Sequence, residues 1–150
     1  SVLEQVMARW EELAPGFAVN SNGQKRLQKI IRSYPLDEIY EAMDIASEQY
    51  LEFKDDGTVT DDSWERGFKK IEGICRVRKS ESEKPYLKDL YYARGILRKR
   101  VYVDEGYVME MMENAVIAGA DPQWIIQEAR YCRNWTQFRD SMHDALGENA

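Results

Sequence analysis

The sequence has little of the chemistry on which enzymes and metal proteins rely. It has one histidine, His143, and two cysteines, Cys75 and Cys132, in 150 residues. A single histidine cannot build a multi-histidine metal site, and the Glu-x-x-His pairs of carboxylate metal centres in helical bundles are missing. No phosphate-binding loop or dinucleotide-binding glycine motif is present. We therefore expect a protein that is not an enzyme and that binds no cofactor and no metal.

Long hydrophobic runs are also missing. No apolar stretch approaches the roughly 20 residues of a membrane span, and the N-terminus has no basic-then-apolar signal pattern. Two cysteines are too few for a disulfide framework, and both follow helical apolar spacing, which predicts buried thiols in a cytoplasmic protein without membrane contact. The first residue is Ser1 rather than methionine, which fits a C-terminal piece of a longer chain.

Apolar residues that repeat every three or four positions dominate the sequence, and this period is typical of amphipathic helices. No stretch of period-two alternation competes with it. We predict a compact all-α fold of about eight helices, in one domain covering residues 1–150. Residues 78–85 are predicted to be a loop. The expected helices cover 2–14, 20–34, 35–53, 62–77, 85–102, 105–118, 121–135 and 136–146, with caps at Thr60 or Asp61, Asp104 and Asp121.

The charges are unevenly distributed along the chain. Residues 66–100 hold twelve Lys or Arg and four Asp or Glu, a net charge of +8, which leaves −14 for the rest of a chain whose total is −6. An asymmetry of this size indicates either internal ion pairs or a basic surface on an acidic body.

Two segments in this basic stretch share one pattern: FKKIEGICR (68–76) and LYYARGILR (90–98). At 100° per residue, Gly73 and Gly95 lie nearly opposite the apolar stripes of their helices, among basic side chains. A glycine inside a helix costs roughly 0.5–1 kcal/mol relative to alanine. Either another helix crosses closely at each glycine, or a ligand approaches there. The two apolar stripes are Trp64, Phe68, Ile71 and Cys75, and Tyr86, Leu90, Ala93, Leu97 and Val101.

The ligand alternative predicts a nucleic-acid interface. Cations contact phosphates, and aromatic rings stack on unpaired bases, so basic residues interleaved with tyrosines suit single-stranded DNA or another nucleic acid. Gly73 and Gly95 would be the points of close approach. The predicted contact residues are Lys69, Lys70, Arg76, Arg78, Lys79, Tyr91, Arg98, Lys99 and Arg100.

The segment CRNWTQFRD (132–140) combines aromatic and arginine side chains near the end of the sequence. Trp135 and Phe138 fit a closing core contact that holds the last helix. Alternatively they form an aromatic anchor for a protein partner, because Trp and Arg are favoured at the centres of interfaces.

Three segments carry a family resemblance: SWERGFKKIEGICR, DLYYARGILRKR and PLDEIYEAMDIASEQYL. They resemble the DnaD-type primosome and helicase-loader modules of phage and mobile-element replication proteins, over about residues 35–102. The resemblance implies a non-enzymatic helical domain that contacts DNA and replication proteins.

Together these observations predict a DNA-associated accessory module for replication or recombination, which binds DNA through the basic helical face. The alternative is an acidic helical protein-interaction or inhibitor module, whose acidic surface contacts a basic protein partner.

Overall fold

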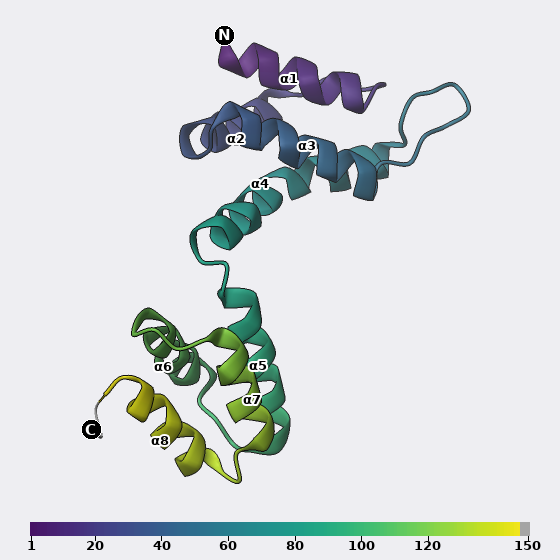
Figure 1. The fold of residues 1–150 in the computed structure, drawn as a ribbon. Coiled ribbons are helices and arrows are strands. Elements are labelled where there is room, and N and C mark those ends of the chain that lie inside the picture. Colours follow the sequence, from purple (N-terminus) through teal and green to yellow (C-terminus); the bar gives the residue numbers. More distant parts are fainter. Residues whose placement is uncertain (148–150) are drawn as a thin grey trace. The chain divides into compact units, whose positions relative to one another are not determined.

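The computed structural model describes residues 1–147, which form eight α-helices (Figure 1). Within these residues there is no β-strand, only one isolated bridge between Phe53 and Val59. The prediction of an all-α fold of about eight helices is confirmed. The helices are α1 (Val2–Leu13), α2 (Ser21–Ser33), α3 (Leu36–Tyr50), α4 (Asp61–Glu83), α5 (Leu87–Arg100), α6 (Glu105–Ile117), α7 (Pro122–Tyr131) and α8 (Trp135–Ala145).

Local sequence signals set most of the helix ends. The Thr60 hydroxyl accepts a hydrogen bond from the backbone N–H of Ser63 at 3.3 Å, so Thr60 caps α4 as predicted. Asp104 and Asp121 cap α6 and α7 in the same way. Gly119 follows α6 with a φ of +113°, a conformation that costs other residues energy.

Helix α4 is longer than the sequence predicted. It continues to Glu83, so the expected loop over 78–85 is wrong for residues 78–83. This stretch contains no glycine or proline before Pro85, and its serines and charged residues tolerate a helix well enough to extend a long one. The N–H of Lys84 still donates to the carbonyl of Ser80 at 2.7 Å. Helix α5 correspondingly begins at Leu87, two residues after Pro85.

The chain divides into two compact units, whereas the sequence predicted one domain. The first unit is Ser1–Lys79, and the second begins at Ser80. Each has its own hydrophobic core, and none of the buried residues in the range 1–147 belongs to both. Apolar periodicity identifies the buried face of each helix but does not say which helices share a core, so this division was not visible in the sequence.

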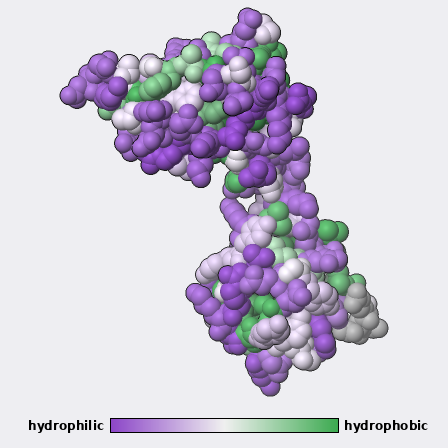
Figure 2. All heavy atoms as spheres, turned by 180° about the vertical axis from the view of Figure 1, so that it is seen from behind, coloured by the Kyte–Doolittle hydropathy of each residue, from purple (hydrophilic) through white to green (hydrophobic). Residues whose placement is uncertain are grey.

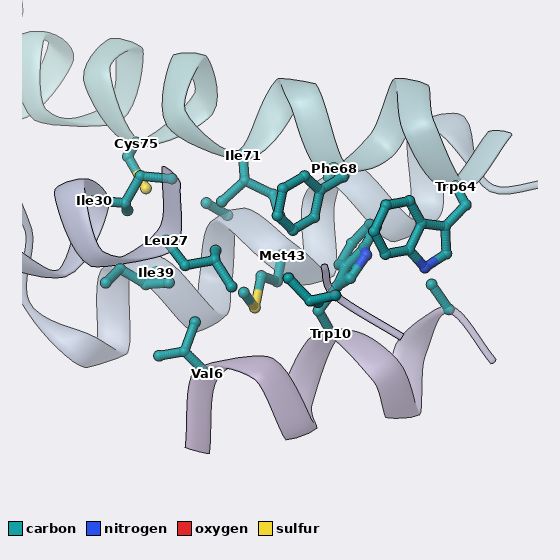
Figure 3. Close-up of a cluster of buried hydrophobic side chains, with 14 of the residues drawn as sticks. Val6, Trp10, Leu27, Ile30, Ile39, Met43, Trp64, Phe68, Ile71 and Cys75 are labelled. Atoms are coloured by element: carbon teal, nitrogen blue, oxygen red, sulfur yellow. The ribbon is translucent and has the colours of Figure 1, made fainter. Parts of the chain in front are cut away.

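The core of the first unit is centred on aromatic rings from α1 and α4 (Figure 3). The Trp10 side chain is fully buried and lies edge-on to Trp64 and Phe68, with ring centroids 6.3 and 6.1 Å apart. Trp64 and Phe68 stack on each other at 5.0 Å. The predicted apolar stripe of α4, which includes Ile71 and Cys75, is buried in this core.

The core of the second unit is formed by α5, α6, α7 and α8. Leu90, Ala93 and Leu97 of α5 are fully buried, as their spacing predicted. Phe138 is fully buried, and the half-buried Trp135 lies 6.1 Å from it. The core interpretation of the 132–140 segment is therefore confirmed.

We predict that neither thiol reacts with a disulfide reagent while the protein is folded. Cys75 and Cys132 are free and buried. Burial raises the pKa of the Cys75 thiol to about 11, with a further contribution from the Glu38 carboxylate. Because the thiolate is the reactive form, a colorimetric thiol assay should give almost no signal in buffer and two equivalents in guanidinium chloride. Rapid labelling of the folded protein would contradict this burial.

Candidate nucleic-acid interface

The residues predicted to form one basic surface belong to two units. Lys69, Lys70, Arg76, Arg78, Lys79 and Gly73 lie on α4 in the first unit, and Tyr91, Gly95, Arg98, Lys99 and Arg100 lie on α5 in the second unit. The candidate interface therefore consists of two surfaces, one on each unit.

The glycine of the α4 surface is uncovered. Apart from its chain neighbours and the backbone of its own helix, a Cβ atom built on Gly73 would have one neighbour within 4 Å, the Nη2 atom of Arg76 on the same helix, at 3.7 Å. No other helix crosses at this point. Lys69 and Arg76 are exposed, and neither forms an ion pair within residues 1–147.

The other predicted cations of α4 interact with α3 and with Tyr34, the residue that follows α2. Arg78 forms an ion pair with Glu38 at 3.1 Å. The Lys70 ammonium lies 5.7 Å from the centre of the Tyr50 ring, and that of Lys79 lies 5.8 Å from the Tyr34 ring. These contacts are partly exposed, so they stabilise the unit only modestly. On α4, Lys69 and Arg76 are therefore the cations that are most available to a ligand.

The glycine of the α5 surface is completely open. No heavy atom lies within 4 Å of a Cβ built on Gly95, apart from the backbone of its own helix and its chain neighbours. Around it is a shallow cavity of about 490 Å³, which we call the Gly95 hollow. Its lining residues are Tyr91, Tyr92, Gly95, Ile96, Arg98, Lys99 and Arg100.

Two exposed tyrosines border the Gly95 hollow, and arginines hold both of them. Tyr91 and Tyr92 are 52% and 53% exposed. The Arg94 guanidinium lies 5.2 Å from the centre of the Tyr91 ring. Arg130, from the neighbouring helix α7, donates a hydrogen bond of 2.8 Å to the Tyr92 hydroxyl and lies 5.6 Å from its ring centre. The rings are thus positioned before any ligand arrives.

The cations at the end of α5 differ in how far they are engaged. Arg98 donates a hydrogen bond to Glu105 in an exposed ion pair. Arg100 donates to the carbonyl of Ala129 at 2.8 Å and contacts the Cys132 sulfur at 3.4 Å, so it binds the last turn of α7. In the part of the chain that the structure describes, no ion pair is found for Lys99, whose charge is directly available.

Of the two alternatives for Gly73 and Gly95, a closely crossing helix is found at neither position among the described residues. Close helix contacts occur at two other glycines. A Cβ on Gly67 would lie 3.0 Å from the Trp10 ring, and one on Gly23 would lie 2.7 Å from Val19 and 3.2 Å from Phe68. Because these glycines lie at packed faces, they have a structural reason to lack a side chain. Gly73 and Gly95 have none.

A small polar cluster fixes the start of α5. Glu113 of α6 accepts hydrogen bonds from the Lys84 ammonium at 2.8 Å and from the Tyr86 hydroxyl at 3.1 Å. The bond from Lys84 is the main reason that the pKa of Glu113 is lowered, and the same bond raises the pKa of Lys84. Burial raises the pKa of Tyr86. Because the Lys84 side chain is half-exposed, the ion pair adds little stability, and the main effect of the cluster is to orient the start of α5.

Arg94 and Arg130 belong to the α5 surface but were not predicted from the sequence. Arg94 was in the basic stretch, and its spacing of three residues from Tyr91 is a signal that could have identified it. Arg130 is 38 residues from Tyr92, so only the tertiary packing of α7 against α5 brings them together.

Comparison with known proteins gives no further guidance. No family model, no curated protein and no solved structure matches this chain. Among residues 1–147, no group of three or more His, Cys, Asp or Glu is placed to hold a metal ion. None of the described helices is long and apolar enough to cross a membrane.

Proposed function

We propose that the protein is a non-enzymatic accessory module that binds DNA through the basic faces of α4 and α5. The observation that carries the proposal is the pair of uncovered glycines, Gly73 and Gly95. Each lies on the exposed face of its helix, opposite a buried apolar stripe. Each costs the helix stability without a packing contact in return, and each is bordered by available cations.

The side chains around these glycines suit a polyanion with aromatic groups. Lys69 and Arg76 on α4, and Lys99 on α5, are accessible positive charges that can contact phosphates. A helix face without a Cβ lets a phosphate backbone approach the peptide groups closely. The exposed rings of Tyr91 and Tyr92 add a surface on which bases can stack.

The setting of this activity is proposed from the sequence. The segments that resemble DnaD-type replication modules include α3 and parts of α4 and α5. On that basis we propose a role in replication or recombination, in the cytoplasm, with replication proteins as further partners. The chain would act by binding, with no cofactor of its own.

The proposal is tested by measuring DNA binding against salt concentration. Because phosphate contacts release counterions, the logarithm of the binding constant should fall linearly with the logarithm of salt, with a slope of about −0.7 for each single-strand contact. Fluorescence anisotropy with a labelled oligonucleotide should show binding at low salt, and the slope should be about −2 or steeper. An absence of binding at low salt would overturn the proposal.

A second candidate function is binding of a basic protein through an acidic surface. Exposed acids on α3 and around the start of α4 form no ion pair within the described residues. On the side of the molecule shown in Figure 2, hydrophilic residues predominate and hydrophobic ones form only small patches, so such a contact would be electrostatic. A protein partner that stays bound after nuclease treatment and in high salt would favour this function. The acids are Glu41, Glu48, Asp55, Asp61 and Asp62.

A further inference from the structure

The residues that line the Gly95 hollow are arranged as in a binding site for one nucleotide. Tyr91, Gly95 and Arg98 are spaced four and three residues apart, so they lie along one stripe of α5. Tyr91 borders the hollow on the N-terminal side of the glycine, and Arg98 and Lys99 border it on the C-terminal side. Arg98 also donates a hydrogen bond to Glu105, whereas no ion pair of Lys99 is found among the described residues. An aromatic ring and positive charges therefore flank the open helix surface at Gly95.

We propose that this hollow binds an unpaired base stacked on Tyr91, with the adjoining phosphate held by Lys99 and Arg98. The inference rests on the proposed function and narrows its substrate to single-stranded nucleic acid. Arg94 contacts the Tyr91 ring and Arg130 holds Tyr92, so the rings need no rearrangement before stacking. A base inside a duplex cannot stack on a side chain in this way, because its faces are covered by neighbouring base pairs.

The proposed base-binding site specifically requires that Gly95 has no side chain. A Cβ atom at this position would meet no heavy atom within 4 Å beyond its chain neighbours and the backbone of its own helix, so a larger side chain could be accommodated there. It would then occupy the hollow. Substitution of Gly95 should therefore favour folding and oppose binding, a combination that a purely structural glycine would not give.

The first experiment compares three ligands with the full chain at low salt. These are an oligothymidylate, the same length of abasic strand, and a matched duplex. One stacked base contributes about five- to 150-fold in affinity, so the oligothymidylate should bind at least fivefold more tightly than either of the others. If the abasic strand binds equally well, the proposed base-binding site is wrong, but the proposed DNA-binding function stands. If none of the three binds, the proposed function itself fails.

The second experiment uses Gly95→Leu, with Gly106→Leu as the matched control. Gly106 is an exposed glycine in the first turn of α6, where a Cβ would have only the Asp104 carboxylate nearby, at 3.6 Å. Gly95→Leu should raise the Tm by a few degrees and weaken oligothymidylate binding at least fivefold. Gly106→Leu should leave binding within about twofold of wild type. Unchanged binding by folded Gly95→Leu would overturn the inference.

A further pair of variants separates the ring of Tyr91 from its hydroxyl. Tyr91→Phe keeps the stacking surface and should retain oligothymidylate binding within about twofold. Tyr91→Leu keeps an apolar side chain but removes the ring, and should weaken binding at least fivefold. Equal affinities for the two variants would show that no base stacks on Tyr91.

Discussion

The double variant Arg98→Gln with Lys99→Gln is expected to weaken single-strand DNA binding by about 25-fold at 0.1 M salt. Each phosphate contact contributes a factor of about five under these conditions, because the binding constant scales with salt to the power of about −0.7 per contact. Loss of two contacts should also reduce the salt slope by about 1.4. Glutamine is chosen because it removes the charge without placing a carboxylate beside Glu105, the ion-pair partner of Arg98.

The matched control for this variant is Lys25→Gln with Lys54→Gln. Both lysines are exposed and form no ion pair in the described chain, and they lie on α2 and in the loop before α4. The control has the same change in net charge, so it measures the nonspecific effect of a more acidic protein. We expect less than about threefold weaker binding. Equal losses for the two double variants would show that DNA does not contact the end of α5 specifically.

Replacement of Trp10 by alanine is expected to lower the unfolding free energy of the first unit by about 3–5 kcal/mol, the usual range for a buried tryptophan. The ring is fully buried and contacts Trp64 and Phe68. It also fills the space that Gly67 leaves open, where a Cβ would come within 3.0 Å. Its removal should therefore leave a cavity in the core, and urea unfolding followed by circular dichroism should report the loss.

Two controls separate packing from the mere presence of an aromatic residue. Trp10→Phe keeps an aromatic ring in the core and should lose markedly less stability than Trp10→Ala. Phe53→Ala removes a ring that is 59% exposed in the loop before α4, and should change stability by less than about 0.5 kcal/mol. A loss below about 1 kcal/mol for Trp10→Ala would mean that this ring is not central to the first core.

Much of the fold could be predicted because its signals are local. The buried stripe from Trp64 to Cys75 follows from spacing alone, and Asp104 and Asp121 cap helices where their chemistry predicts. The end of α4 was misjudged because serine and charged residues are compatible with both a loop and a helix. In that stretch, continuation of a long helix prevailed.

The candidate site could be predicted only in outline. The helical spacing of 100° per residue placed Gly73 and Gly95 on basic faces, but whether another helix covers a glycine depends on packing between distant segments. The same holds for the Arg130–Tyr92 contact and for the binding of Arg100 to the end of α7. Packing of this kind also gives Arg98 and Arg100, which are close in sequence, different partners: Arg98 contacts Glu105, and Arg100 contacts the carbonyl of Ala129.

The most direct test of the central claim is an amide NMR titration of the labelled full chain with an oligothymidylate at low salt. The claim is that the open face of α5 is the surface that DNA occupies. The account predicts that the largest shift changes fall on residues 91–100, with the Gly95 amide among them, while Gly106 and Gly119 stay unchanged. Shift changes confined to the acidic residues of α3, or an unperturbed Gly95 in a saturated complex, would contradict it.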